Sequence, residues 1–358
     1  MSRGPPLRPL ILAWGCTLDG KEEGDFQQLL HTLDELKKRG QRVRTLTIDP
    51  LRTPWNSPLA CDTFRSGAAP IEALQQAIML LQTAKEQLVF ITGRDFLRSE
   101  YSASERQQLM NIYGASVLDS YNLLAKRFLL TQGITASDFK TLAHSLFENY
   151  ERTWRARGRG HQDKASADEK WFAPVSSLFR GVDCANPVVD FEGGLLLGST
   201  PPHQEGIEVL SAVVETLPLD GPAAIEALVS YSHLEHALKR AQLYAGISLT
   251  AKAEEQALLL EVYSCFPVVP LAFLLKSKLI PGLKSAPAFL STHAITVTGG
   301  MNLAKAPWNN PALHALVVMC EQLRHNQQIG LVHGNGGLGY KQGVAILRLN
   351  SPMALNKH

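Results

Sequence analysis

Two glycine-rich turns with a helix pattern between them, near the end of the chain, constrain the fold more than any other stretch. The turns are Gly299-Gly300 and the run GNGGLG that begins at Gly334. Between them, residues 311–325 repeat apolar side chains at three- and four-residue spacing, which predicts a helix with one buried face. Either Asn309 or Asn310 could be its N-cap, with Pro311 in the first turn. The run GVAILRL that follows predicts a buried strand.

The rest of the chain alternates strand and helix patterns. β-branched and apolar runs predict strands, and stripes of three- and four-residue period predict helices. Residues 207–220 fit either a strand or a helix. The strands are predicted at 10–14, 43–48, 87–92 and 258–262, and the helices at 26–38, 70–84, 104–133, 136–155 and 230–244. Such alternation favours an α/β layered fold.

Composition narrows the class of protein. With 358 residues the chain is long enough for two or three subdomains, and a formal charge of +2 argues against a protein built around nucleic acid. No apolar run is as long as a membrane span, and the N-terminus lacks the pattern of a signal peptide. The five cysteines are scattered, without the spacing of a zinc site or a disulfide framework. We therefore expect a cytoplasmic protein.

Several motifs occur in a defined order. The segment 295–347 contains TVTGG, PWNN, a helix ending in EQLR, GLVHGNGG and a closing strand, and LLLEVYSCFP occurs upstream at 258–267. This set resembles thiolases, most closely the branch of thiolase-like proteins related to sterol-carrier-type thiolases. Residues 182–199 resemble the segment that closes the first half of that fold, through Asp190, Gly193 and Gly194.

The resemblance implies the thiolase fold, in which two similar halves stack as α-β-α-β-α layers. The first half is expected at 1–205, including a helical loop subdomain at about 100–185, and the second at 206–358. A thiolase-like chain of this kind is also expected to form a dimer, either with itself or with a thiolase homologue.

The positions that carry thiolase chemistry have changed. A gapless register places Gly67 where the family has its nucleophilic cysteine, and a shifted register places Phe64 there. Cys61 lies six residues before Gly67, outside the start of the predicted helix. Ala306 replaces the family's Gly-His-Pro histidine, and Tyr263 with the serine after it replaces His-Asp. The standard thiolase reaction, which needs an activated thiolate and a proton carrier, is therefore not expected.

Cys265 and His333 remain as candidate catalytic residues. A buried cysteine at a strand end can be a simple apolar residue, and a buried histidine can be merely hydrogen-bonded. Alternatively, the two side chains form a Cys–His pair able to transfer or hydrolyse an acyl group if they approach within about 3–4 Å. Gly336 and Gly337 would let the backbone approach a bound thioester.

A basic segment could bind the phosphates of coenzyme A. The arginines of 152–159 either form a solvated loop or create an electropositive rim, for which Arg155 and Arg157 are the main candidates. His233 and His236 share a predicted helix face, but no third ligand accompanies them, so no metal site is expected. No cofactor is expected apart from a coenzyme A thioester as substrate.

Two functions follow from these observations. In the first, the chain is a degenerate acyl-CoA acyltransferase-like protein that binds an acyl-CoA or a related thioester. In the second, it is a non-catalytic binding or assembly subunit that partners an active thiolase homologue. Convergence of Cys265 and His333 in an open pocket would favour the first. A pocket collapsed behind Trp308, Phe266 or Met301 would favour the second. Nucleic-acid binding through the arginines has little support, because aromatic residues are sparse among them.

Overall fold

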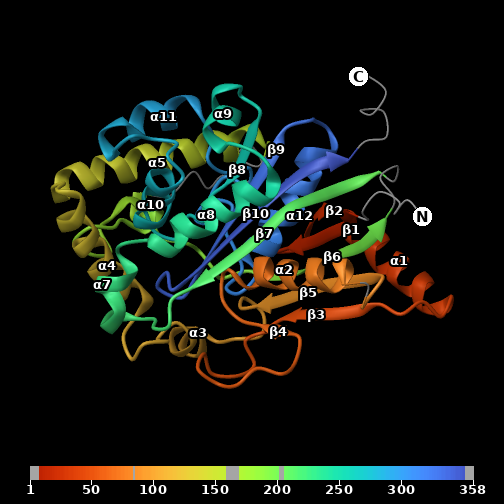
Figure 1. The fold of residues 1–358 in the computed structure, drawn as a ribbon. Helices are drawn as coiled ribbons and strands as arrows, with labels where there is room; N and C mark the ends of the chain where they lie inside the picture. The colour runs from red at the N-terminus through yellow and green to blue at the C-terminus, as the bar shows by residue number, and fades with distance from the viewer. Residues whose placement is uncertain (1–7, 84, 159–168, 201–204, 351–358) are drawn as a thin grey trace.

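The computed structural model describes residues 8–83, 85–158, 169–200 and 205–350, which form one mixed sheet with helices on both sides (Figure 1). The strand order is β4-β3-β5-β6-β1-β7-β10-β9-β8, and β2 pairs with β1 outside this path. The strands are β1 (Arg8–Leu18), β2 (Lys21–Gly24), β3 (Arg44–Ile48), β4 (Thr63–Phe64), β5 (Leu88–Phe96), β6 (Asp190–Thr200), β7 (Gly206–Thr216), β8 (Leu258–Glu261), β9 (Ile329–Gly336) and β10 (Lys341–Asn350). Residues 207–220, for which the sequence allowed two alternatives, thus contain a strand.

The helices follow the predicted stripes closely, with one exception. They are α1 (Phe26–Lys38), α2 (Ala69–Gln82), α3 (Ala103–Leu109), α4 (Val117–Gln132), α5 (Ala136–Ala156), α6 (Glu169–Phe172), α7 (Ile225–Leu228), α8 (Ser232–Ala245), α9 (Leu249–Glu254), α10 (Val268–Lys276), α11 (Ala286–Thr292) and α12 (Pro311–Arg324). The single helix predicted at 104–133 is wrong, because it is divided into α3 and α4. Gly114 has a φ of 73°, and the Ser116 hydroxyl accepts a hydrogen bond from the Asp119 amide to begin α4.

The sheet contains the same four-strand pattern twice. In the first half the order is β3-β5-β6-β1, and in the second it is β8-β9-β10-β7. In each half the first pair is parallel and the next two pairs are antiparallel. Helices α1 and α2 occupy the same places in the first half as α8 and α12 in the second. The halves join where β1 pairs with β7 through Ile11 and Ile207. The chain thus folds as two similar α/β repeats.

Helices α2 and α12 form the middle layer of the molecule. They contact each other and strands of both halves, while α1 covers β1 and β6 and α8 covers β7 and β10. Figure 1 shows α2 and α12 near the centre of the view and α1 at its edge. The core around the middle layer is fully buried and joins both halves through Ile71, Leu316, Leu195 and Leu347. This arrangement is the predicted α-β-α-β-α layering.

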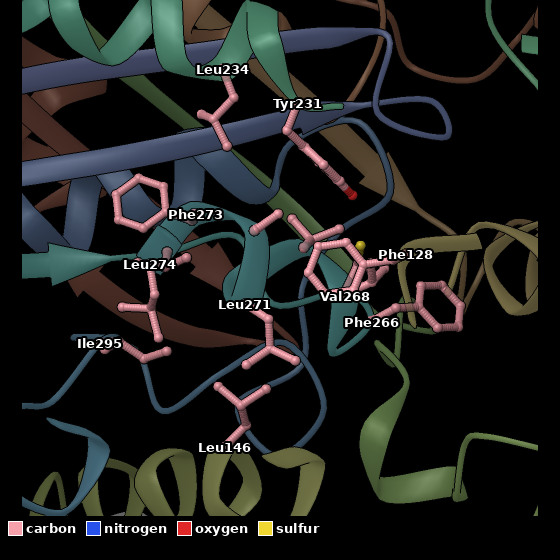
Figure 2. Close-up of a cluster of buried hydrophobic side chains, with 14 of the residues drawn as sticks. Phe128, Leu146, Tyr231, Leu234, Phe266, Val268, Leu271, Phe273, Leu274 and Ile295 are labelled. Atoms are coloured by element: carbon pink, nitrogen blue, oxygen red, sulfur yellow. The ribbon is translucent and has the colours of Figure 1, made fainter. Parts of the chain in front are cut away.

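A second core anchors the helical loop region to the second half of the fold. Figure 2 shows part of this cluster, in which Phe128 of α4 and Leu146 of α5 join Leu271 and Phe273 of α10. The Asn149 side chain on α5 donates hydrogen bonds to the backbone carbonyls of Leu290 and His293. The loop region therefore packs firmly over the strands that carry the site. No described helix is long and apolar enough to cross a membrane.

Candidate functional site

A cavity of about 560 Å³ lies between the loop region and the ends of the central strands. Four of the motif segments contribute to its wall: Gly67 before α2, Tyr263 after β8, Ala306 before α12 and Asn335 at the end of β9. Apolar and aromatic side chains supply much of the remaining wall. These include Met110, Val117, Leu118, Val188, Phe266 and Met301, together with Trp55, Trp171 and Trp308. The cavity therefore lies where the motifs converge, and Trp308, Phe266 and Met301 line it without closing it.

Tyr263 occupies the space in which a side chain at position 67 would lie. A Cβ atom added to Gly67 would be 2.1 Å from the Tyr263 hydroxyl oxygen and 2.5 Å from the backbone oxygen of Asn335. Both distances are far inside van der Waals contact. Burial raises the pKa of the Tyr263 hydroxyl well above its usual value, so this group is neutral. Gly67 and Tyr263 therefore fit each other sterically.

Cys265 lines the cavity, but its surroundings do not favour a thiolate. Burial raises the pKa of its thiol to about 12, although a hydrogen bond with the Tyr121 hydroxyl and nearby backbone amides act in the opposite direction. The Tyr121 ring stacks on Phe266, with centroids 4.2 Å apart. A thiol with this pKa is almost entirely protonated at neutral pH and is a weak nucleophile.

His333 lies in β9 behind the cavity wall and does not line the cavity. Its Nε2 atom is 2.7 Å from Oε1 of Gln342 on β10, and its ring packs against Phe273 with centroids 4.9 Å apart. An amide oxygen only accepts, so Nε2 carries the proton. Burial lowers the pKa of His333 to about 4, which makes the ring neutral at physiological pH. The buried Nδ1 atom makes no hydrogen bond with the described residues.

A series of hydrogen bonds leads from His333 through Gln342 and Asn335 to Tyr121, and none of them directly joins His333 to Cys265. Gln342 Nε2 donates to Asn335 Oδ1 at 2.7 Å, and Asn335 Nδ2 donates to the Tyr121 hydroxyl at 2.9 Å. Tyr121 in turn donates to the Gly337 carbonyl at 2.8 Å. Two carboxamides lie within this series, and neutral amides do not accept and release protons as an imidazole does. The arrangement orients side chains but does not make a Cys–His acid–base pair.

The two candidate glycines lie in different environments. Gly337 lines the cavity with a φ of 56°, and a Cβ atom there would be 2.0 Å from the Asp220 carboxylate. Gly336 is the last residue of β9, pairs with Lys341 and is absent from the cavity wall. Gly337 is thus the glycine of the pair that is placed to approach a ligand.

The candidate phosphate-binding arginines are directed elsewhere. Arg155 is exposed and forms an ion pair with Glu151 on the same helix. Arg157 is largely buried, where it pairs with Glu23 at 2.8 Å and donates to the Val297 carbonyl. Neither lines the cavity. Arg159 lies outside the described residues. The sequence pattern gave no sign of the Arg157–Glu23 pair, because its members are 134 positions apart.

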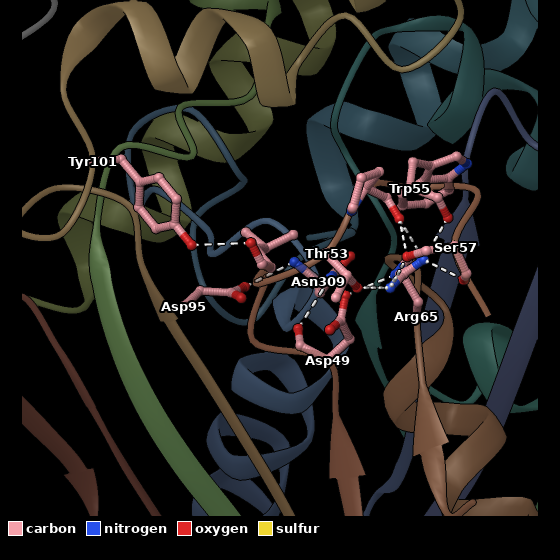
Figure 3. Close-up of polar contacts among 10 residues, drawn as sticks. Asp49, Thr53, Trp55, Ser57, Arg65, Asp95, Tyr101 and Asn309 are labelled. Atoms are coloured by element: carbon pink, nitrogen blue, oxygen red, sulfur yellow. Dashed lines mark hydrogen bonds and ion pairs between the residues drawn. The ribbon is translucent and has the colours of Figure 1, made fainter. Parts of the chain in front are cut away.

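Trp55 reaches the cavity from a loop that a buried arginine holds in place. Figure 3 shows Arg65 pointing into this loop, with Nε 2.7 Å from Oδ2 of Asp49. Its Nη1 atom donates to the carbonyl oxygens of Pro54 and Ser57. The Arg65 side chain is only 5% exposed. It therefore fixes both the loop and the segment that enters α2.

A buried carboxylate closes the beginning of α12. Asp95 Oδ2 accepts hydrogen bonds from the backbone amides of Asn309 and Asn310, at 2.7 and 3.2 Å. Burial raises the Asp95 pKa to about 7, against the lowering effect of these hydrogen bonds. Asn310 is the N-cap residue, but its own side chain makes no capping hydrogen bond. The capping function predicted for an asparagine thus belongs to an aspartate from β5.

Sequence reasoning missed three residues of the site. Tyr121 lies within the helix predicted at 104–133, which gave no reason to place it in a site, and Asn335 and Trp55 had no periodic signal. Tyr121 and Asn335 become recognisable only once α4 and β9 are adjacent in space. Arg106 is the one charged residue among those that line the cavity, and it donates to the Leu97 backbone carbonyl. Among the described residues, no group of three or more potential metal ligands occurs.

Layering, repeat and motif positions together define the thiolase fold, and comparison with solved structures supports this. No family model and no curated protein matches the sequence. The chain is similar to a monomeric SCP2-thiolase like protein type 1 from Mycobacterium smegmatis, at 18% identity and a TM-score of 0.67, over 96% of this chain and 78% of that one.

Two further structures extend the comparison. The chain is similar to the Ltp2-ChsH2(DUF35) aldolase, at 13% identity and a TM-score of 0.63, over 97% of this chain and 99% of that chain. It is also similar to Acat5 thiolase from Ascaris suum, solved in complex with coenzyme A, at 15% identity and a TM-score of 0.59, over 95% and 99%. Likenesses at these identities show the fold, so the predicted fold class is confirmed.

Proposed function

We propose that this protein binds an acyl thioester in the cavity and does not perform the standard thiolase reaction. The observation that carries the proposal is the relationship between Gly67 and Tyr263. The motif segments still surround one cavity of about 560 Å³, yet a tyrosine hydroxyl lies where a nucleophile would project from position 67. A pocket of this size is within the range of small-molecule sites.

The character of the wall indicates which part of a ligand it would hold. Apolar and aromatic side chains dominate, and the guanidinium of Arg106 is already engaged with backbone carbonyls. Burying a charged group there would be costly without a partner of opposite charge. We therefore assign the cavity to the uncharged acyl part of the ligand, with any phosphates outside it.

Binding is favoured over acyl transfer by the geometry of the two candidate catalytic residues. Cys265 lines the cavity with a pKa raised by burial, and His333 is hydrogen-bonded to Gln342 behind the wall. Acyl transfer through a cysteine requires a thiolate or an adjacent base. This arrangement supplies neither.

A second candidate function is assembly with a thiolase homologue. The observation in its favour is the likeness to the Ltp2-ChsH2(DUF35) aldolase, whose name joins two components. The fold can retain a partner surface after its chemistry has been lost. Light scattering, alone and with candidate homologues, tests this function. A stable mixed complex would support it, and a monomer that binds no homologue would contradict it.

Calorimetry with acetyl-CoA and decanoyl-CoA tests thioester binding. Wild type is expected to bind the longer chain more tightly, and Met110→Trp, which adds bulk at the cavity wall, should weaken that binding at least tenfold. Leu130→Trp on α4 is the matched control, because Leu130 is 73% exposed. Thioester hydrolysis is followed in the same samples. Absence of binding to both ligands would overturn the proposal, and turnover that disappears in Cys265→Ala would replace it with an enzymatic function.

A further inference from the structure

The Tyr263 hydroxyl is a hydrogen-bond donor that faces the cavity without a protein partner. Tyr263 lines the cavity, and no hydrogen bond connects its hydroxyl to the described residues. Its ring is held in place, since it meets His333 edge-to-face with centroids 6.4 Å apart. A rigid ring with an unpaired hydroxyl in an apolar cavity needs an acceptor from a ligand or from water.

The cavity-lining groups near this hydroxyl are uncharged, and the buried Asp95 carboxyl, which does not line the cavity, raises the Tyr263 pKa beyond the effect of burial. Cys265, on the same segment, is protonated at neutral pH, and Tyr121 is also neutral because burial raises its pKa. Gly67 has no side chain, and the hydroxyl lies where its Cβ atom would be. Tyr263 therefore remains a neutral donor throughout the physiological pH range.

We propose that Tyr263 is a specificity-determining residue that donates a hydrogen bond to a neutral carbonyl oxygen of the ligand, so that the cavity selects thioesters and ketones over analogues without this oxygen. The inference rests on the proposed binding of a thioester. It assigns the recognition of the carbonyl group to one side chain. Position 263, where the family that the sequence resembles has the histidine of its His-Asp pair, would then serve for binding rather than for catalysis.

The chemistry of the site explains why the acceptor is a carbonyl. A neutral phenol and a neutral carbonyl form a hydrogen bond without burying a charge, whereas a carboxylate would need a cation that this part of the wall lacks. A ligand without the oxygen would leave the hydroxyl buried and unpaired. The free-energy cost of that unpaired hydroxyl is the main reason why such a site binds a ligand with the carbonyl oxygen more tightly than one without it.

Two ligands that differ by one oxygen provide the test. Decanoyl-pantetheine and its S-decyl thioether are titrated by calorimetry into wild type and Tyr263→Phe, each as the full chain. Wild type is expected to prefer the thioester about 3- to 10-fold, as one net hydrogen bond allows. Tyr263→Phe keeps the ring, so it should bind the thioether at least as tightly as wild type and lose the preference for the thioester.

The outcomes separate this inference from the proposed function. If wild type and Tyr263→Phe show the same preference, Tyr263 does not recognise the carbonyl, and thioester binding still stands. If wild type binds neither ligand, thioester binding itself is overturned. Tyr244→Phe serves as the control variant, because Tyr244 on α8 is 59% exposed and does not line the cavity. It should retain the preference, and melting curves confirm that each variant is folded.

Discussion

Arg65 and Asp49 form a buried ion pair, with Nε 2.7 Å from Oδ2 and both side chains at most 6% exposed. The pair lies beneath the loop that carries Trp55 and immediately before the segment that enters α2. Loss of one partner would leave the other buried and uncompensated. The pair therefore connects the shape of the cavity wall to the stability of the fold.

Arg65→Met is expected to lower the free energy of unfolding by about 3–5 kcal/mol, because the Asp49 carboxylate would remain buried without a counter-ion. Urea denaturation measures this change. Arg42→Met is the matched control, since Arg42 pairs with Glu86 while 76% exposed, and it should cost less than about 1 kcal/mol. Equal losses in the two variants would show that burial of the Arg65 pair is unimportant.

The fit between Gly67 and Tyr263 makes a second prediction. Gly67→Ala should destabilise the fold by about 1–3 kcal/mol, because its Cβ atom would overlap the Tyr263 hydroxyl and the Asn335 backbone. Adding Tyr263→Ala should make the effect of the Gly67 substitution smaller, in a double-mutant cycle measured by denaturation. Gly282→Ala is the control, since no atom lies within 4 Å of an added Cβ there. If the losses in free energy of unfolding from the two substitutions simply add, the steric relationship between Gly67 and Tyr263 is contradicted.

Thiol reactivity provides a third prediction. In the native protein Cys61, which is exposed, should react rapidly with a disulfide reagent, whereas Cys265 should not. With a pKa of about 12, only roughly one Cys265 side chain in ten thousand would be a thiolate at pH 8. Absorbance of the released thiol follows the reaction. The rapid phase should disappear in Cys61→Ser and persist in Cys265→Ala, and the reverse result would indicate an activated Cys265.

The buried Asp95 carboxyl makes stability depend on pH. Its pKa is about 7 in the folded protein and near 3.8 when exposed, so between these values the folded state retains a proton that the unfolded state releases. Its contribution to the free energy of unfolding is therefore complete below pH 4 and decreases as pH rises to 7, by on the order of 4 kcal/mol. Denaturation of wild type and Asp95→Asn at pH 5 and pH 8 measures this. The variant should lose less stability over that interval, and parallel curves would contradict the prediction.

The fold could be predicted well because its signals are local. The apolar stripe at 311–325 and the strand runs depend on the hydrophobic periodicity of neighbouring residues, and the structure forms helices and strands there. The division between α3 and α4 was missed although Gly114 and Ser116 are ordinary turn and N-cap residues. The apolar stripe continues through Ile112 and Tyr113 and obscured them. Ile112 and Tyr113 lie between α3 and α4 and line the cavity.

The site was predictable only in part because its geometry depends on distant pairs. The sequence predicted Gly67 and Ala306 as changed positions, but it did not indicate that Tyr263 fills the space beside Gly67. It also did not indicate that His333 is hydrogen-bonded to Gln342 and does not line the cavity, or that Glu23 pairs with Arg157. Each of these contacts joins residues on different elements, and only the packed sheet brings them together.

The internal repeat produces two equivalent helix starts, but only one of them lies beside the cavity. Because the halves share one topology, α2 and α12 are equivalent, and each begins against the end of a strand from the other half. At α12, the buried Asp95 carboxyl group accepts hydrogen bonds from the first backbone amides. At α2, position 67 has no side chain and the large cavity opens instead. The two equivalent helix starts therefore differ: a carboxyl group from β5 closes one, and the proposed ligand cavity lies beside the other.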